Sequence, residues 1–246
     1  MSKNEEIAIT VKDLHVYYRD MNRFTLKKAS KEKGSGKIFK AVKGVSFEIP
    51  KGQILGICGK NGSGKSTLLR AISGIFSADK GSINLHKNSI SLLSIGVGFQ
   101  KQLTGYENIY LSGMLLGYTK EEIDTKVDEI IKFSELGDFI YRPVRAYSSG
   151  MYSKLAFSIT AILETDIMLI DEVLSVGDIH FKEKSYNKMK ELISDSNRTV
   201  VIVSHSSKTI IELCDRVIWL HDGLIKDDGD PEEVMEKYEE FMRSEA

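Results

Sequence analysis

The eight residues that start at Gly59 have the types and the spacing needed to bind a phosphate chain. They read GKNGSGKS and fit the phosphate-binding pattern G-x-x-x-x-G-K-S/T. The glycines let successive backbone N–H groups point at one anion, while Lys65 is expected to reach the β- and γ-phosphates and Ser66 to ligate Mg²⁺. The predicted binding residues are Gly59, Asn61, Gly62, Ser63, Gly64, Lys65, Ser66 and Thr67.

The flanking segments supply the local structure that this motif needs. Residues 54–58 are apolar, as in a buried strand, and residues 66–72 have helical character. Strand, loop and helix in this order form the context in which the pattern binds nucleotide. The alternative is a glycine-rich turn without a ligand, and the agreement between pattern and context argues against it.

Further candidates follow two later apolar segments. Residues 167–170 lead directly into Asp171 and Glu172, and residues 200–203 are followed shortly by His205. A strand that ends beside a phosphate-binding loop brings its carboxylate to the metal, so Asp171 is expected to hold Mg²⁺ through water and Glu172 to be the general base. A lone histidine is more often an ordinary loop residue, but this context favours a hydrogen bond to the γ-phosphate.

Composition narrows the class of protein. The 246 residues include 34 Lys and Arg against 35 Asp and Glu, so bulk charge does not argue for a nucleic-acid partner. No segment approaches roughly eighteen consecutive apolar residues, and the N-terminus lacks an apolar signal segment. The two cysteines, Cys58 and Cys214, lie in apolar surroundings, and Cys58 is expected to be a small core residue. We expect a cytosolic protein that meets a membrane through a partner.

The order of apolar segments predicts an α/β fold. Residues 7–11 and 45–49 alternate as half-buried strands do, and short apolar strands return at 167–170, 200–203 and 217–220. Short apolar strands separated by helical segments predict a mostly parallel sheet covered on both faces.

Helical patterns dominate the middle and the end of the chain. Thr119 and Glu122 form a capping box that opens one helix with Ile123, Val127, Ile130 and Ile131 on its apolar face. Asp230 and Pro231 begin a terminal helix whose buried stripe is expected to be Val234, Tyr238 and Phe241.

Residues 147–151 carry a resemblance to a known family. They read YSSGM before a helical segment, and small residues at a helix start form an anion site. This segment resembles the L-S-G-G-Q signature of ABC transporter ATPases and stands at the family's spacing before Asp171. Together with the phosphate-binding loop, Glu172 and His205, it gives the chain a specific resemblance to that family over nearly its whole length.

The resemblance implies ATP and Mg²⁺ as cofactors and a homodimer in which each signature binds the γ-phosphate of ATP held by the other subunit. Ser148, Ser149 and Gly150 are the implied contacts, although Tyr147, Ser149 and Met151 depart from the consensus. Asp178 matches the aspartate of the loop that crosses the dimer interface.

Two further positions are implied by the same family. Gln100 matches the glutamine that senses Mg²⁺ and the attacking water, with Gln102 as an alternative. Tyr18 is the predicted aromatic residue that stacks on adenine, with Tyr17 or Phe39 as alternatives.

The resemblance also implies a domain organisation. Residues 1–246 are expected to form a single ABC nucleotide-binding domain, with an N-terminal antiparallel β part. Its P-loop core comprises approximately residues 1–95 and 164–246, and a helical signature subdomain comprises approximately residues 96–163. The sequence stops at Ala246, so we expect no C-terminal carbohydrate-binding domain.

Details of these motifs resemble the polysaccharide-export branch of the family. They are Phe99 with residues 103–109, the signature at 147–151 and residues 171–178. The branch implies an ATPase at the cytoplasmic face of the cell membrane that drives two copies of a six-helix permease for a lipid-linked polysaccharide. Wall teichoic acid is the leading substrate, and O-antigen or capsule polysaccharide the alternative. A soluble non-transport ABC ATPase and a P-loop kinase are weaker alternatives.

Two segments are expected to face the membrane system. Residues 19–40 contain eight Lys and Arg against one Asp and one Glu, a net charge of +6. This basic stretch is either a solvated loop or a membrane-facing segment that helps to admit an anionic lipid-linked substrate. The segment that follows Gln100, through Asn108 and Tyr110 to Gly117, is expected to dock on the permease.

Overall fold

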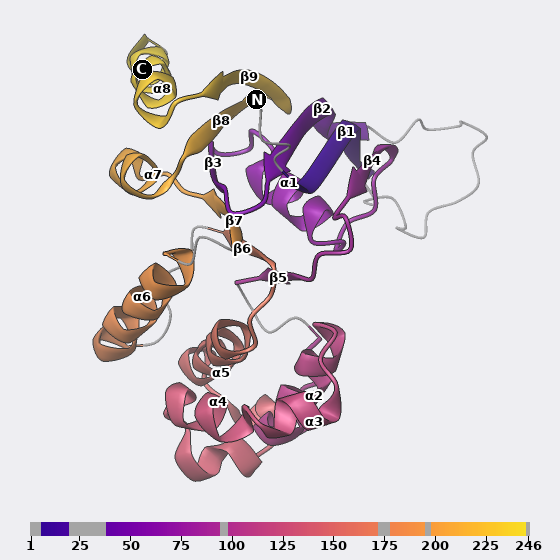
Figure 1. The fold of residues 1–246 in the computed structure, drawn as a ribbon, viewed down its shortest axis with the longest axis vertical. Coiled ribbons are helices and arrows are strands. Elements are labelled where there is room, and N and C mark those ends of the chain that lie inside the picture. Colours follow the sequence, from indigo (N-terminus) through magenta and orange to yellow (C-terminus); the bar gives the residue numbers. More distant parts are fainter. Residues whose placement is uncertain (1–5, 20–37, 94–97, 172–177, 195–197, 245–246) are drawn as a thin grey trace, which may run out of the picture.

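The computed structural model describes residues 6–19, 38–93, 98–171, 178–194 and 198–244. Figure 1 shows two sheets in the upper part of the molecule and a separate group of helices below them. Glu172 and the part of the basic stretch at residues 20–37 lie outside the described residues. Among the described helices, none is long and apolar enough to cross a membrane.

The six-stranded sheet has the order β5-β6-β7-β3-β8-β9. Adjacent strands in this sheet are parallel from β5 to β8, and β9 is antiparallel to β8. The strand bounds are β3 (Ile54–Cys58), β5 (Ile90–Leu92), β6 (Ile167–Asp171), β7 (Thr199–Val203), β8 (Arg216–His221) and β9 (Leu224–Gly229).

Both faces of this sheet are buried, as the sequence predicts. In β7, Val201 and Val203 pack on the side of the antiparallel sheet, whereas Val200 and Ile202 pack on the opposite side. Helix α1 (Lys65–Ile72) covers the first face, and helices α6 (Ile179–Ile193), α7 (Ser207–Leu213) and α8 (Pro231–Ser244) cover the second. The predicted parallel α/β core is therefore confirmed.

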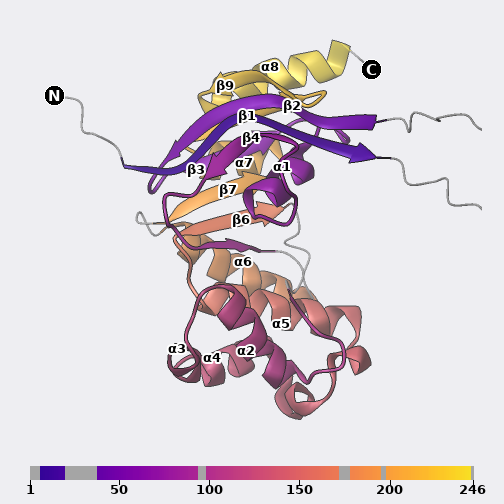
Figure 2. The same cartoon turned by 90° about the vertical axis from the view of Figure 1, so that its right-hand side faces the viewer.

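The second sheet is antiparallel and has the order β2-β1-β4. It consists of β1 (Ile7–Arg19), β2 (Ile38–Pro50) and β4 (Lys80–Asn84), and Figure 2 shows it above strands β6 and β7 of the larger sheet. The predicted strands at 7–11 and 45–49 are much longer than the alternating pattern indicates. As a result, Arg19 and residues 38–40, which the sequence groups with the basic stretch, lie in paired strands.

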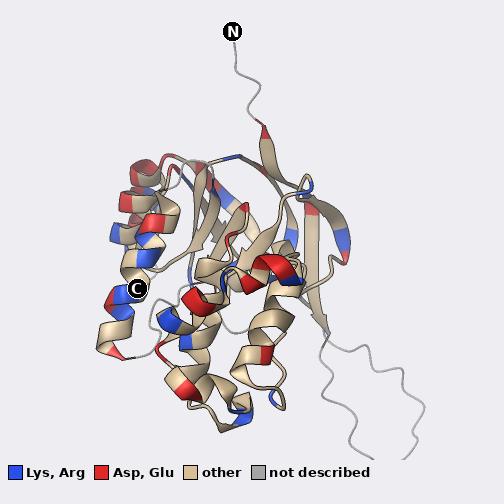
Figure 3. Ribbon diagram, turned by 60° about the horizontal axis from the view of Figure 1, so that its bottom comes forward, with Lys and Arg blue, Asp and Glu red and all other residues tan. Residues whose placement is uncertain are grey.

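Six helical elements occupy most of residues 105–162, between β5 and β6 in the chain. The elements are α2 (Gly105–Leu115), α3 (Lys120–Asp124), α4 (Val127–Ser134), η1 (Gly137–Tyr141), η2 (Val144–Ala146) and α5 (Ser149–Ile162). They enclose a core of their own that includes Ile109, Ile130 and Leu155. Charged residues of both signs are interspersed on the described helices (Figure 3).

Two helix predictions have different outcomes. The capping box at Thr119 is present. The prediction of a single helix after it is wrong, because the helix is interrupted between α3 and α4. There the Thr125 hydroxyl donates to the Glu122 carbonyl at 2.7 Å, a local bond that competes with helix continuation. The terminal helix is confirmed: the Asp230 carboxylate accepts from two backbone N–H groups and Val234 is buried.

Cys58 is confirmed as a buried core residue, and Cys214 is buried as well. Burial raises the pKa of each thiol to about 12, so both remain protonated at neutral pH and are poor nucleophiles.

Candidate nucleotide-binding site

The phosphate-binding loop connects β3 to α1, as the sequence predicts. Gly64 is the N-cap of α1 with a φ of 107°, and a Cβ atom there would lie 2.4 Å from the Ala41 carbonyl oxygen of β2. Gly59 has a φ of 145°, and its Cβ would lie 2.1 Å from the Leu220 carbonyl oxygen. Both positions therefore require glycine for conformation and for space.

A pocket opens over this loop. Its described lining residues are Phe39, Ala41, Asn61, Gly62, Gly64, Lys65, Ser66, Thr67 and His205. Since β3 and β7 are parallel neighbours, the P-loop after β3 and His205 after β7 lie at the same edge of the sheet. The structure thus brings the predicted γ-phosphate histidine to the pocket of the predicted phosphate-binding residues.

Lys65, which lines this pocket, supplies a cation suited to a phosphate ligand. The Lys65 ammonium donates to the carbonyl oxygens of Gly59 at 2.6 Å and Lys60 at 3.1 Å, and Lys65 is 6% exposed. The Ser63 hydroxyl is buried and has no hydrogen-bond partner among the described residues. Ser63 is not among the described residues that line the pocket.

A candidate Mg²⁺ position lies between α1 and β6. The Ser66 hydroxyl donates to the Asp171 carboxylate at 3.2 Å, and Asp171 is the last residue of β6. Among the described residues, no group of three His, Cys, Asp or Glu side chains is placed to hold a metal. One hydroxyl and one carboxylate instead suit Mg²⁺, which commonly binds through one or two protein ligands together with substrate phosphates and water.

The structure separates the three aromatic candidates for the nucleotide base. Tyr18 is 41% exposed, its hydroxyl forms a 3.0 Å hydrogen bond with Thr67, and it does not line the P-loop pocket in the part of the chain that is described. The Tyr17 hydroxyl forms a 3.0 Å hydrogen bond with Nδ1 of His15. Phe39 is 59% exposed and lines the pocket, and its ring centroid lies 6.4 Å from that of Tyr18. Phe39 is thus the aromatic residue at the pocket itself, with Tyr18 beside it.

The predicted signature residues lie at the start of α5. Ser148 is the N-cap, and its hydroxyl accepts from the Met151 N–H at 3.2 Å. Ser148 and Ser149 are exposed, while Met151 packs on the helical core and the Tyr147 hydroxyl donates to the Phe139 carbonyl at 2.8 Å. Two of the departures from the consensus, Tyr147 and Met151, therefore make contacts within the helical region.

Other predicted positions are not brought to the P-loop pocket. None of Gln100, Gln102, Ser148, Ser149, Gly150 and Asp178 is among its described lining residues. Gln100 and Gln102 are exposed. Asp178 is the N-cap of α6, and its carboxylate accepts from the Phe181 N–H at 3.0 Å.

Sequence reasoning missed two residues that organise this region. Asn108 is buried and exchanges hydrogen bonds with the backbone of Gln100, at 2.7 Å and 3.1 Å. Lys154 forms a 2.7 Å ion pair with Asp178. An asparagine in an apolar helical segment is a signal for the first, while nothing local in the sequence pairs Lys154 with a residue so far along the chain.

The comparisons with known proteins agree with the family that the sequence resembles. The ABC transporter family profile matches residues 42–175. The chain is 40% identical over 244 residues to a teichoic acids export ATP-binding protein of Staphylococcus epidermidis, covering 99% of this chain and 91% of that protein. It is 44% identical over 202 residues to an O-antigen export system ATP-binding protein of Myxococcus xanthus, covering 82% and 46%.

Another relative is much longer than this chain. The chain is 44% identical over 208 residues to a teichoic acids export ATP-binding protein of Bacillus anthracis, covering 85% of this chain and 38% of that protein. The chain therefore spans less than half the length of this relative and of the Myxococcus protein.

Solved structures support the fold. A dimeric ATP-binding cassette in a post-hydrolysis state, bound to ADP and Pi, has a TM-score of 0.68 at 23% identity and covers 91% of this chain and 98% of that one. An ATP-binding subunit of an ABC transporter has a TM-score of 0.71 at 20% identity and covers 94% and 93%. At these identities the likeness establishes the fold.

The parallel sheet, its P-loop after β3 and the carboxylate at the end of β6 define a P-loop nucleotide-binding protein. The chain belongs to the ABC transporter family. The predicted resemblance to the polysaccharide-export branch is confirmed by its similarity to the teichoic-acid and O-antigen proteins.

Proposed function

We propose that this chain is the ATP-hydrolysing subunit of an ABC exporter for a lipid-linked polysaccharide, with wall teichoic acid as the leading substrate. The observation that carries the proposal is the P-loop pocket, where Lys65, Ser66 and His205 meet and where Asp171 bonds Ser66. ATP hydrolysis by the purified chain tests the activity. The cargo is tested in cells depleted of their own export ATPase. Expression of this chain together with its permease should restore polymer export in those cells.

Each residue has a separate role in the proposed reaction. Lys65 and the P-loop N–H groups hold the β- and γ-phosphates, and Mg²⁺ held near Ser66 and Asp171 supplies charge neutralisation there. Glu172 takes the proton from the attacking water, by the family resemblance. His205, at the pocket wall, donates a hydrogen bond to a γ-phosphate oxygen as charge builds up.

The active unit is proposed to be a homodimer. Ser148, Ser149 and Gly150 lie outside the described lining of their own chain's P-loop pocket, so a second chain is needed to bring a signature to each ATP. Ile179, directly after Asp178, is 87% exposed at the start of α6. Such an exposed apolar side chain beside the proposed interface loop is consistent with burial against a partner.

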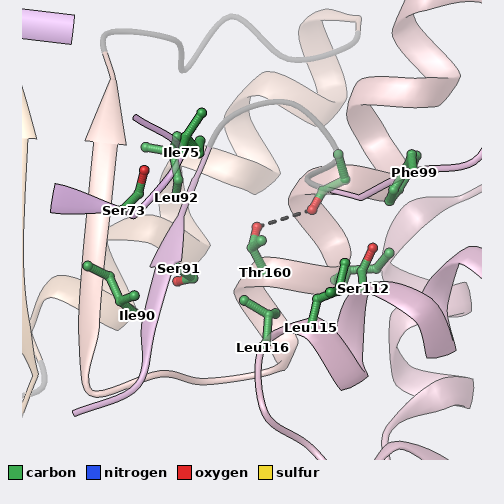
Figure 4. Close-up of a pocket in the computed structure, with 12 residues that line it drawn as sticks. Ser73, Ile75, Ile90, Ser91, Leu92, Phe99, Ser112, Leu115, Leu116 and Thr160 are labelled. Atoms are coloured by element: carbon green, nitrogen blue, oxygen red, sulfur yellow. Dashed lines mark hydrogen bonds between the residues drawn. The ribbon is translucent and has the colours of Figure 1, made fainter. Parts of the chain in front are cut away.

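The permease is proposed to dock where the helical region meets the core sheet. A largely apolar pocket lies there, lined by Ile75 and Leu92 from the core, by Phe99, and by Leu115 and Leu116 from the predicted docking segment (Figure 4). Leu115 is an exposed apolar residue at this position. A cytoplasmic segment of a six-helix permease, two copies per complex, is the proposed occupant, which places this chain at the cytoplasmic face of the membrane.

Cross-linking between a cysteine introduced at Leu115 and the permease tests the docking proposal. Cross-links from this position that change in yield with ATP would support it, because the segment follows Gln100, the predicted sensor of Mg²⁺ and the attacking water. Permease cross-links confined to another face, such as α8, would contradict it.

A further inference from the structure

A cluster of charges joins the signature helix α5 to the start of α6. Lys154, in the second turn of α5, forms ion pairs with Asp178 at 2.7 Å and with Glu135 at 3.4 Å. Lys184 of α6 pairs with Glu135 at 2.8 Å, and the His180 ring lies 3.9 Å from the same carboxylate. The cluster therefore contains the three elements α4, α5 and α6.

Lys154 is held more firmly than a surface lysine. Its side chain is only 14% exposed, and its ammonium lies 4.9 Å from the ring centroid of Phe181, which is fully buried. Burial opposes its charge, but hydrogen bonds and charges from Asp178 and Glu135 outweigh this, and the pKa of Lys154 is raised. An ion pair with one partner fixed by packing loses less entropy on forming than a pair of mobile surface side chains.

Asp178 has two ties that act together. One carboxylate oxygen accepts from the Phe181 N–H at 3.0 Å, which caps α6, and the other pairs with Lys154. The Lys154 hydrogen bond, followed by the Phe181 N–H bond, lowers the pKa of Asp178 to about 2. The carboxylate is therefore ionised at neutral pH and connects the two helices.

We propose that Lys154 is a positioning residue that holds Asp178 and the N-terminus of α6 in a fixed place against the signature helix, so that the two parts of the partner-facing surface move together. This inference rests on the proposed homodimer. In that dimer, each chain presents both its signature and Asp178 to the other chain. The ion pair between Lys154 and Asp178 therefore fixes the positions of these two contacts relative to each other. Its loss lowers association and turnover while the P-loop of each chain still binds nucleotide.

Four variants of the full chain test the link. Lys154→Met removes the charge and keeps the length of the side chain. Lys154→Arg keeps the charge, and Asp178→Asn removes the charge while keeping an oxygen that can cap α6. Lys184→Met is the matched control, because it removes an ion pair with Glu135 and leaves the bond between Lys154 and Asp178 intact.

The readouts separate positioning from general stability. ADP affinity, measured by calorimetry, reports the P-loop of one chain, whereas kcat and ATP-driven dimer formation report the assembled pair. We expect Lys154→Met and Asp178→Asn each to lower kcat about tenfold and to weaken dimer formation similarly, with ADP affinity unchanged within about twofold. The double variant should fall no further than either single variant, and Lys154→Arg and Lys184→Met should remain within about twofold of the wild type.

Three results would overturn the link. They are wild-type kcat and dimer formation in Lys154→Met, additive losses in the double variant, or a loss of ADP affinity that matches the loss of kcat. Failure of the proposed function looks different, because the wild-type chain itself would then neither hydrolyse ATP nor form a dimer in the presence of ATP.

Discussion

The P-loop and the signature segment both stand at the N-terminus of a helix, yet the chain surrounds them very differently. At α1, Gly64 caps the helix without a side chain, Lys65 and His205 line one pocket, and the Asp171 carboxylate accepts a hydrogen bond from Ser66. At α5, the Ser148 hydroxyl caps its own helix, and Ser148 and Ser149 are exposed. A single chain therefore brings several predicted phosphate-binding residues together at one helix, whereas the predicted signature contacts at the other helix lie outside that pocket among the described residues.

The largest effect is expected from Lys65→Ala in the P-loop pocket. The Lys65 ammonium is the buried cation beneath the proposed phosphates, so its loss should weaken ATP binding and lower hydrolysis by roughly 10²–10³-fold. Calorimetric ATP titration and a steady-state ATPase assay measure the two effects. Normal hydrolysis in a folded Lys65→Ala variant would remove the P-loop from the proposed mechanism.

A second variant tests whether His205 acts on the reaction or only on the fold. His205→Ala should lower kcat by roughly a hundredfold while ATP affinity changes little, because its proposed hydrogen bond strengthens as charge develops on the γ-phosphate. His205→Gln, which retains a hydrogen-bond donor, is the matched control. If ATP affinity falls as much as kcat, His205 has a structural role instead.

The aromatic edge of the pocket predicts a smaller change confined to binding. Stacking of a base on an aromatic ring contributes about 1–3 kcal/mol, so Phe39→Ala should weaken ATP binding by roughly tenfold. Binding of tripolyphosphate, which has no base, should not change. Tyr18→Phe removes the hydrogen bond to Thr67 and keeps the ring. It therefore distinguishes the loss of that hydrogen bond from the loss of an aromatic ring. Equal losses for ATP and tripolyphosphate would show that Phe39 shapes the phosphate pocket rather than the base site.

The smallest effect is expected in the helical region. Thr104 and Glu107 form a capping box at the start of α2, so Thr104→Ala should lower the free energy of unfolding by about 1 kcal/mol. Chemical denaturation measures this loss, and ADP affinity should be retained because α2 supplies no described residue to the P-loop pocket. Reduced ADP affinity in a folded variant would mean that the two regions are more tightly coupled than their separate cores indicate.

The sequence predicts the P-loop region better than the rest of the site. Residues 54–72 form the predicted strand, loop and helix, because the motif is local and its glycines are required by close contacts with Ala41 and Leu220. Contacts between distant segments are harder to predict. The alternating pattern does not reveal how far β1 and β2 extend, and no local signal places Phe39 at the pocket or pairs Lys154 with Asp178.

The resemblance supplies roles that the described structure does not test. Glu172 lies outside the described residues, and Gln100 and Gln102 remain alternatives for the sensor glutamine. The proposed partition into a core and a helical subdomain at residues 96–163 also remains a prediction.

The shared ATP site is the central claim, and Glu172→Gln tests it most directly. Glutamine keeps the shape of the proposed general base but cannot take a proton, so ATP should remain bound and hold two chains together. Size-exclusion chromatography with ATP and Mg²⁺ should then show a dimer, and the same variant with ADP should elute as a monomer. A Glu172→Gln chain that binds ATP and still elutes as a monomer would contradict the account.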